Sequence, residues 1–121
     1  MEKLRAIDFR FFIGCSCYIV DEFYKSRIPS IIEGVDGLLN KVIIHQVNYD
    51  PNVIKLVLRR FESLSREEIQ ELNKLWPNEN IKRSLSESIN LDAYIINYLT
   101  LLHIDVFNWI DKGLAIDAAY N

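Results

Sequence analysis

The hydrophobic period of this chain changes near its midpoint, and the change limits the folds that the chain can adopt. Residues 53–60 alternate, so that Ile54, Leu56 and Leu58 share one face of an extended segment. Such alternation is typical of a strand with one buried side. From Ser65 onward the apolar residues recur at the spacing of a helix. The pattern predicts an α+β fold, with strands first and helices last, in a single domain of 121 residues.

The first half predicts a small antiparallel sheet of about three to five strands. Apolar and β-branched runs indicate strands at residues 15–20, 28–33 and 41–47. Pro29 makes the second of these a strand start or an edge strand, because proline has no amide hydrogen to donate. Turn-forming residues at 48–52 predict a hairpin that pairs 41–47 with 53–60.

Two further segments of the first half are a predicted turn and a segment that the pattern does not assign. Residues 34–37 contain two glycines and predict a turn. Residues 4–13 fit both a helical stripe and the alternation of a strand, so helix and strand both stay open there.

A capping box at the start of the second half is the most specific local signal in the chain. The Ser65 hydroxyl can accept a hydrogen bond from the Glu68 amide, and the Glu68 side chain can return the bond. Leu64 and Ile69 stand on either side of this cap, where a hydrophobic staple is found. Pro77 ends the predicted helix. The residues expected to face the core are Ile69, Leu72 and either Leu75 or Trp76.

Two more helices are expected to cover the sheet. Asn90 can cap the first of them, and Asp105 can cap the second, which Gly113 ends in the left-handed conformation. The apolar stripe of the Asn90 helix consists of Leu91, Tyr94, Ile95, Tyr98, Leu99 and Leu102. Residues 78–87 predict a loop or a short turn of helix, and residues 114–121 are expected to dock as an extended segment.

Net charge and hydrophobicity limit the partners and the cellular location that we expect for the protein. A net charge of −3, from 17 acidic and 14 basic residues, argues against a general nucleic-acid binder, since such proteins carry surplus cations. No run approaches the roughly 18–20 apolar residues of a membrane span, and the N-terminus lacks the apolar segment of a signal peptide. We therefore expect a cytoplasmic protein with no membrane partner and two reduced cysteines.

Metal and nucleophilic chemistry have few candidate residues. Cys15, Cys17, His45 and His103 could form a metal site only if distant segments met, whereas structural zinc sites usually pair ligands about two to four residues apart on turns. A reactive thiolate needs nearby positive charge, and both cysteines have aromatic neighbours instead. The carboxylates are explained as helix caps or solvated helix faces. The sequence therefore predicts no enzyme activity, metal or cofactor.

A small basic group is the first candidate for a functional surface. It consists of Lys55, Arg59, Arg60 and Arg66. Its first two members share the outer face of the strand at 53–60, and the other two flank the junction between strand and helix. The favoured interpretation is a solvated face, because charged residues are mostly exposed. The alternative is a contact with an anionic partner, either a phosphate backbone or an acidic protein.

Aromatic residues near the C-terminal end are the second candidate. They are Trp76, Phe107, Trp109 and Tyr120. Packing of the helices onto the sheet is the favoured interpretation, and a protein contact such as a dimer is the alternative, because exposed aromatic clusters mark partner surfaces.

Two stretches of the sequence resemble segments of a known group of proteins. Val57-Leu-Arg-Arg-Phe-Glu-Ser-Leu-Ser-Arg-Glu-Glu-Ile69 and His103-Ile-Asp-Val-Phe-Asn-Trp-Ile-Asp-Lys-Gly-Leu-Ala-Ile-Asp117 resemble segments of small uncharacterised proteins from gut-bacterial prophages and mobile elements. The Lys-Gly-Leu-Ala-Ile-Asp ending is the closest part. The chain departs from the family pattern at Arg60-Phe61, where Pro-Leu is usual, and at Asn108-Trp109. The resemblance implies a setting and no catalytic residues.

Together these features predict a non-enzymatic accessory protein of phage or mobile-element origin. It is expected to act by binding another protein or a second copy of itself. The alternative is a nucleic-acid-associated factor that uses the basic group.

Overall fold

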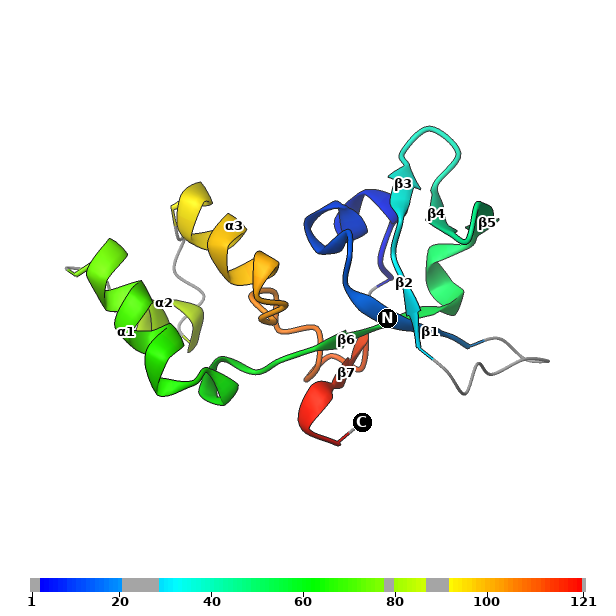
Figure 1. The fold of residues 1–121 in the computed structure, drawn as a ribbon. Coiled ribbons are helices and arrows are strands. Elements are labelled where there is room, and N and C mark those ends of the chain that lie inside the picture. The colour runs from blue at the N-terminus through cyan, green and yellow to red at the C-terminus, as the bar shows by residue number, and fades with distance from the viewer. Residues whose placement is uncertain (1–2, 21–28, 78–79, 87–91, 121) are drawn as a thin grey trace.

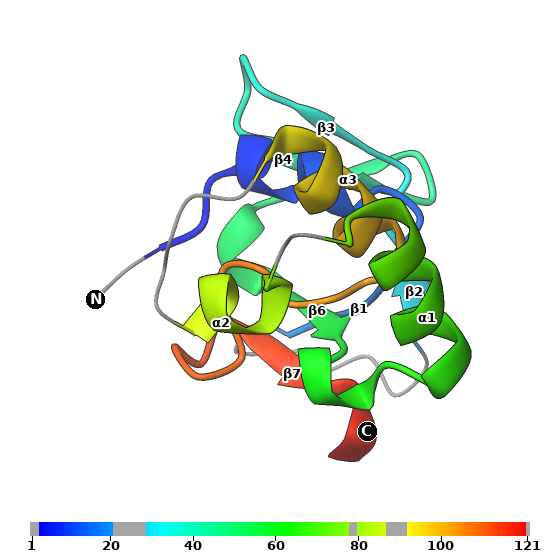
Figure 2. The ribbon, with the colours of Figure 1, turned by 90° about the vertical axis from the view of Figure 1, so that its left-hand side faces the viewer.

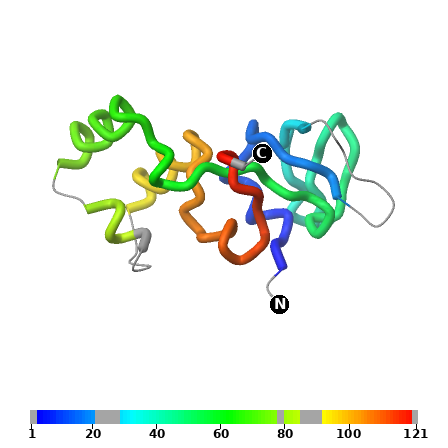
Figure 3. Tube along the Cα trace, turned by 90° about the horizontal axis from the view of Figure 1, so that it is seen from below, coloured from blue at the N-terminus to red at the C-terminus, as the bar shows by residue number. Residues whose placement is uncertain are grey.

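The computed structural model describes residues 3–20, 29–77, 80–86 and 92–120, and it has the predicted mixed α+β composition (Figure 1). The strands form one sheet of four and one of three. The helices α1 (Arg66–Leu75), α2 (Ile81–Ser86) and α3 (Ala93–Leu101) come from the second half of the chain. They gather at one end of the molecule, with α3 nearest the strands (Figures 1 and 3). The helices therefore stand beside the sheets more than across them.

The four-stranded sheet joins the two ends of the chain. Its strands in spatial order are β2 (Ser30–Ile31), β1 (Ser16–Ile19), β6 (Ile54–Leu58) and β7 (Ala115–Asp117). β2 is the edge strand that begins directly after Pro29, as expected. The C-terminal segment docks as an extended strand, also as expected, but β7 runs parallel to β6, with Leu56 opposite Ala115. This pair departs from the predicted all-antiparallel sheet.

The three-stranded sheet corrects two predictions. It consists of β3 (Gly34–Asp36), β4 (Lys41–Ile44) and β5 (Val47–Tyr49). The glycine-containing segment is thus mainly a strand, and the strand predicted over 41–47 turns back at His45 and Gln46. These two residues have φ angles of 51° and 64°, which is the conformation of a tight two-residue hairpin. β4 therefore pairs with β5, and β6 pairs with β1 instead.

The ambiguous N-terminal segment is a 3₁₀ helix, η1 (Ala6–Phe12). Ala6, Phe9 and Phe12 are its buried residues. Their spacing of three equals the three residues per turn of a 3₁₀ helix, so all of them fall on one face. That face contacts β3, β4 and α3. The sequence left helix and strand open for residues 4–13, and the structure shows a 3₁₀ helix, which is wound more tightly than an α-helix.

The capping box is confirmed. The Ser65 hydroxyl accepts from the Glu68 amide at 3.1 Å, and the Glu68 carboxylate accepts from the Ser65 amide at 2.8 Å. Helix α1 ends at Leu75, before Pro77. Its buried face is narrower than predicted, because Leu72 is buried whereas Ile69 is 42% exposed and Leu75 is 46% exposed.

Helix α2 occupies part of the segment expected to be a loop or a short helix. Helix α3 begins after Asp92, whose carboxylate accepts from the Tyr94 amide at 2.8 Å. The predicted cap Asn90 and the stripe residue Leu91 lie outside the described residues. Within the stripe, Ile95 and Leu99 are buried and Tyr94 is exposed.

The prediction of a helix after Asp105 is wrong. Residues 105–114 form turns, although Asp105 does act as a cap: its carboxylate accepts from the amides of Trp109 and Ile110 at 2.9 and 2.8 Å. Asn108 has a φ of 61°, which breaks any helix at this point. Gly113, with a φ of 76°, ends the turns as expected and leads into β7.

The buried side chains form two clusters, one in the β-rich part and one among the helices. Figure 2 shows the ribbon from the helical end. The first fills the β-rich part and includes Phe9, Phe12, Leu56 and Trp109 among its members. The second lies among the helices, and its buried members are Leu64, Leu72, Ile81, Ile95, Leu99 and Ile104. Three further 3₁₀ turns complete the chain: η2 (Pro51–Val53), η3 (Phe61–Ser63) and η4 (Ala118–Tyr120).

Candidate functional site

The two cysteines belong to the first core. Cys15 and Cys17 are both fully buried, and the Cys15 thiol donates to the Val57 carbonyl at 3.3 Å. Burial, and for Cys15 also the neighbouring Cys17, raises the thiol pKa values to about 12 and about 11 respectively. Both thiols are therefore protonated near neutral pH. Among the residues that the structure describes, no three His, Cys, Asp or Glu side chains come together as metal ligands.

Arg59 binds a carboxylate and forms a junction between the two cores. Its guanidinium donates to both carboxylate oxygens of Glu68, at 2.8 and 3.0 Å, and also to the carbonyls of Ser63 and Leu102. The hydrogen bonds that Arg59 donates to Glu68, and then the bond from the Ser65 amide, lower the pKa of Glu68 from 4.5 to about 2. The cation thus connects the end of β6, the start of α1 and the end of α3.

Arg60 binds carboxylates on the opposite side of the chain. It donates to Asp117 at 2.7 Å and to Asp111 at 2.9 Å, and these contacts raise its pKa. The Asp117 pKa is lowered, first by the Ala119 amide and then by Arg60. Lys55 donates to the Gly113 carbonyl. These three basic residues therefore fasten the C-terminal segment and α1 to β6.

The basic group is consequently not a continuous cationic surface. Arg59 and Arg60 have their charge compensated by neighbouring carboxylates, and Lys55 is bound to the backbone of the C-terminal turn. Arg66 is exposed at the start of α1. An acidic partner would have to compete with pairs that the fold already contains.

The aromatic residues divide between the two cores. Trp109 is 6% exposed and stacks on Phe107, with ring centroids 5.0 Å apart, so it is not available as a contact surface. Phe107 is half-buried beside it. Trp76 is half-buried against Tyr98, with the ring centroids 5.6 Å apart. The side chain of Tyr120 lies outside the described part of the chain.

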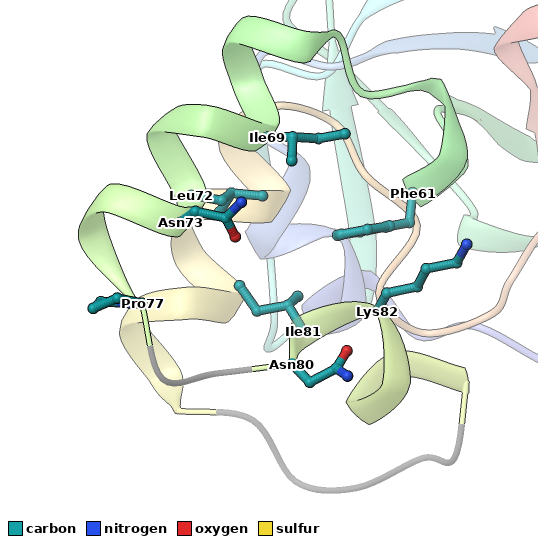
Figure 4. Close-up of a pocket in the computed structure, with 8 residues that line it drawn as sticks. All are labelled: Phe61, Ile69, Leu72, Asn73, Pro77, Asn80, Ile81 and Lys82. Carbon is teal, nitrogen blue, oxygen red and sulfur yellow. The ribbon is translucent and has the colours of Figure 1, made fainter.

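An apolar pocket opens between η3, α1 and α2 (Figure 4). Its volume is about 500 Å³, and it is lined by Phe61, Ile69, Leu72, Asn73, Pro77, Asn80, Ile81 and Lys82. Figure 4 shows Phe61, Ile69 and Ile81 pointing toward a common space, with Lys82 beside it. The pocket was not predicted from the sequence, and Ile69 was expected in the core. The weak signal for it was an apolar residue in the first turn of a helix whose neighbours are all polar.

A pair of exposed leucines at the tip of the β3–β4 hairpin was also missed. Leu38 is 99% exposed and Leu39 is 62% exposed. We call these two residues the leucine tip. In Figures 1 and 2 the β3–β4 loop that carries them projects away from the rest of the fold. An apolar dipeptide inside a turn, next to glycine, was the sequence signal that could have found it.

The loop that carries the leucine tip has a defined conformation. One carboxylate oxygen of Asp36 accepts from the amides of Leu38 and Leu39, at 3.1 and 3.0 Å. Asn40 has a φ of 54°, and its side-chain oxygen accepts from the Ala6 amide at 2.8 Å, which ties the loop to η1. Hydrogen bonds at both ends of the tip therefore hold its backbone while its side chains face solvent.

No protein-family model, curated protein or solved structure matches this chain. In the described part of the chain, no helix has the length and hydrophobicity needed to cross a membrane. The features of the molecule that bear on its function are the leucine tip, the pocket and the ion pairs of Arg59 and Arg60.

Proposed function

We propose that this chain is a non-enzymatic accessory protein, of phage or mobile-element origin, that acts by protein–protein binding through the leucine tip. The observation that carries the binding role is the exposure of Leu38 and Leu39 on a loop that is held by Asp36 and Asn40. The phage setting rests on the resemblance of the segments at 57–69 and 103–117.

The energetics favour a contact at this site. Moving an exposed leucine side chain out of water is favourable by roughly 2 kcal/mol. Part of that gain is usually spent on ordering a flexible loop when it binds. Here the hydrogen bonds of Asp36 and Asn40 already order the backbone of the loop, so the entropy cost of ordering it on binding is smaller.

A nucleic-acid role has weaker support. Arg59 and Arg60 are bound to carboxylates, so they have less positive charge to offer to phosphates. The net charge of −3 adds an unfavourable long-range field. Binding that weakens steeply with added salt would favour this alternative.

The binding role can be tested by site-specific photo-crosslinking. A photoreactive amino acid at position 38 is expected to give one adduct of defined mass in the cells that produce the protein. The adduct should disappear when Leu39→Asp is added, because the tip then loses its apolar character. The matched control places the same reagent at the exposed position of Asn52, which belongs neither to the leucine tip nor to the pocket. Equal crosslinking from both positions, or none from position 38, would contradict the proposal.

A further inference from the structure

We infer that the partner of the leucine tip is a second copy of this chain, which receives the tip in the apolar pocket between η3, α1 and α2. This inference rests on the proposed binding role of the tip, and it adds the identity of the partner and the place where it binds. The two surfaces come from different parts of the molecule, so the contact joins copies head to tail.

The pocket has the size and chemistry that the tip requires. Phe61, Ile69 and Ile81 supply apolar walls around a volume of about 500 Å³. A dry apolar cavity of about 150 Å³ is already large enough to bind benzene. The pocket therefore has room for both leucine side chains of the tip.

Ile69 is the clearest sign that this pocket is incomplete. It lies at the fourth position of α1 and points toward the pocket, yet 42% of it remains exposed. Insertion of an apolar side chain would bury this surface together with the leucines. One contact thus removes both the leucine tip and the exposed surface of Ile69 from water.

The polar surroundings are complementary in charge. The Lys82 ammonium lies beside the pocket, and the Asp36 carboxylate lies two residues before the leucine tip. An acidic group at the base of the tip would approach a cation at the rim of the pocket. Lys41 is opposite Asp36 in the strand register, so this attraction is partly offset and the apolar contact dominates.

The arrangement decides how the copies can associate. The β3–β4 hairpin and the α1–α2 pair lie at opposite ends of the molecule in Figures 1 and 3, so a tip cannot enter its own pocket. A single tip-in-pocket contact leaves a free pocket on one copy and a free tip on the other, so further copies can add unless two copies exchange tips or a ring closes. The small contact, well below the roughly 1,200 Å² of stable interfaces, makes the association weak and concentration-dependent.

A mixing experiment tests the inference. One variant, Leu38→Asp with Leu39→Asp, loses the tip and keeps the pocket. The other, Ile69→Asp, loses the pocket and keeps the tip. In sedimentation velocity up to millimolar concentration, wild type should grow above its monomer mass of 14.2 kDa. Each variant alone should remain monomeric, and their equimolar mixture should form a one-to-one complex. Each variant retains one functional half of the contact, so a contact between the tip of one copy and the pocket of another predicts this result.

Controls separate the contact from a loss of folding. Leu75→Asp places the same charge on α1 at an exposed leucine that does not line the pocket, and it should associate like wild type. Lys82→Glu should weaken association several-fold. Circular dichroism checks that every variant is folded; if Ile69→Asp unfolds, Ile69→Ser replaces it in the mixture.

Each contrary outcome has a defined meaning. Monomeric wild type, or self-association by Ile69→Asp alone, overturns the head-to-tail contact. If position 38 still crosslinks to another protein, the proposed binding role survives and only its partner was assigned wrongly. If position 38 also fails to crosslink, the binding role falls as well.

Discussion

The two hydrophobic cores of this chain differ in how far apart their members lie in the sequence. The first core draws on η1 near the N-terminus, on β1 and β6, and on Trp109 and Ala115 near the C-terminus. The second uses residues between Leu64 and Ile104. The first core can form only when distant segments meet, whereas the second can form from one continuous stretch.

The surfaces of the two regions differ accordingly. The β-rich part exposes four large apolar residues by 43–52%, namely Ile7, Ile13, Ile31 and Val47, and its most exposed ones are Leu38 and Leu39 at the hairpin tip. The helices also leave large side chains exposed, namely Ile69, Leu75, Tyr94 and Leu101, and Ile69 lines the pocket. Incomplete packing of the helices leaves a pocket in one region, and a loop held by hydrogen bonds forms a protrusion in the other.

Arg59 is where the two regions meet. Its amide donates to the His103 carbonyl and its carbonyl accepts from the Asp105 amide, so its backbone continues the parallel pairing beyond β6. Its side chain binds Glu68 in α1. Burial, and then the Arg59 charge, lower the pKa of the neighbouring His103. The stability of one region should therefore respond to changes at this junction.

The largest effect is expected from cutting the first core. Phe12 is fully buried and packs against Trp109 with ring centroids 5.4 Å apart. Phe12→Ala should lower the free energy of unfolding by about 3–5 kcal/mol, and Leu72→Ala in the second core by about 2 kcal/mol. Urea unfolding followed by circular dichroism measures both. Equal losses would show that Leu72 contributes as much to the second core as Phe12 contributes to the first.

The next effect is expected at the junction. Arg59→Ala should cost about 2 kcal/mol of unfolding free energy, because it removes hydrogen bonds to a charged partner and leaves Glu68 unpaired. Arg66→Ala, at an exposed site at the start of α1, should change it by less than about 0.5 kcal/mol. Hydrogen exchange should show greater loss of protection in α1 than in β1. A uniform loss would mean that the junction does not couple two distinct regions.

Acid should act on the same junction. The pKa of Glu68 is about 2 in the fold and near 4.5 without its partners, so its carboxylate binds a proton less readily in the folded chain. Its stabilising contribution is present above pH 4.5 and is lost as pH falls from 4.5 toward 2. Glu68→Gln should flatten the pH dependence of unfolding in this window, with Glu67→Gln as the control. An unchanged slope in Glu68→Gln would contradict the assignment.

The smallest effect is expected from the cap of α1. Ser65→Ala should reduce stability by about 1 kcal/mol, because the Glu68 amide loses its acceptor. Ser65→Asp keeps an acceptor at this position and should restore most of the loss. Thermal unfolding of the three proteins gives the comparison. A loss in Ser65→Asp as large as in Ser65→Ala would show that the cap contributes little to the helical region.

The parts of the fold that were predictable depend on residues close together in the sequence. The capping box at Ser65, the end of α1 before Pro77 and the left-handed Gly113 each involve a few neighbouring residues. The alternation at 53–60 likewise identified β6 and its buried face. The hairpin at His45 and Gln46 was missed, because neither residue type signals a left-handed turn.

The candidate site was less predictable than the fold. Lys55, Arg59, Arg60 and Arg66 were grouped because they are near one another in the sequence, yet the structure turns Arg59 toward Glu68 and Arg60 toward the C-terminal carboxylates. Their partners are up to 58 residues away, the separation of Lys55 and Gly113. The leucine tip and the pocket depend on exposure, which the residue types alone do not fix.

The sequence by itself determined the α+β class, the change from strands to helices near the middle of the chain and the boundaries of α1. Tertiary structure alone decided that β6 pairs with β1 and β7, that the basic residues are bound internally, and that Leu38 and Leu39 project into solvent. The physical reason is the range of the interactions. Caps and turns are set by hydrogen bonds between near neighbours, whereas strand partners, ion pairs and exposed surfaces are settled only when distant segments compete to bury the same apolar area.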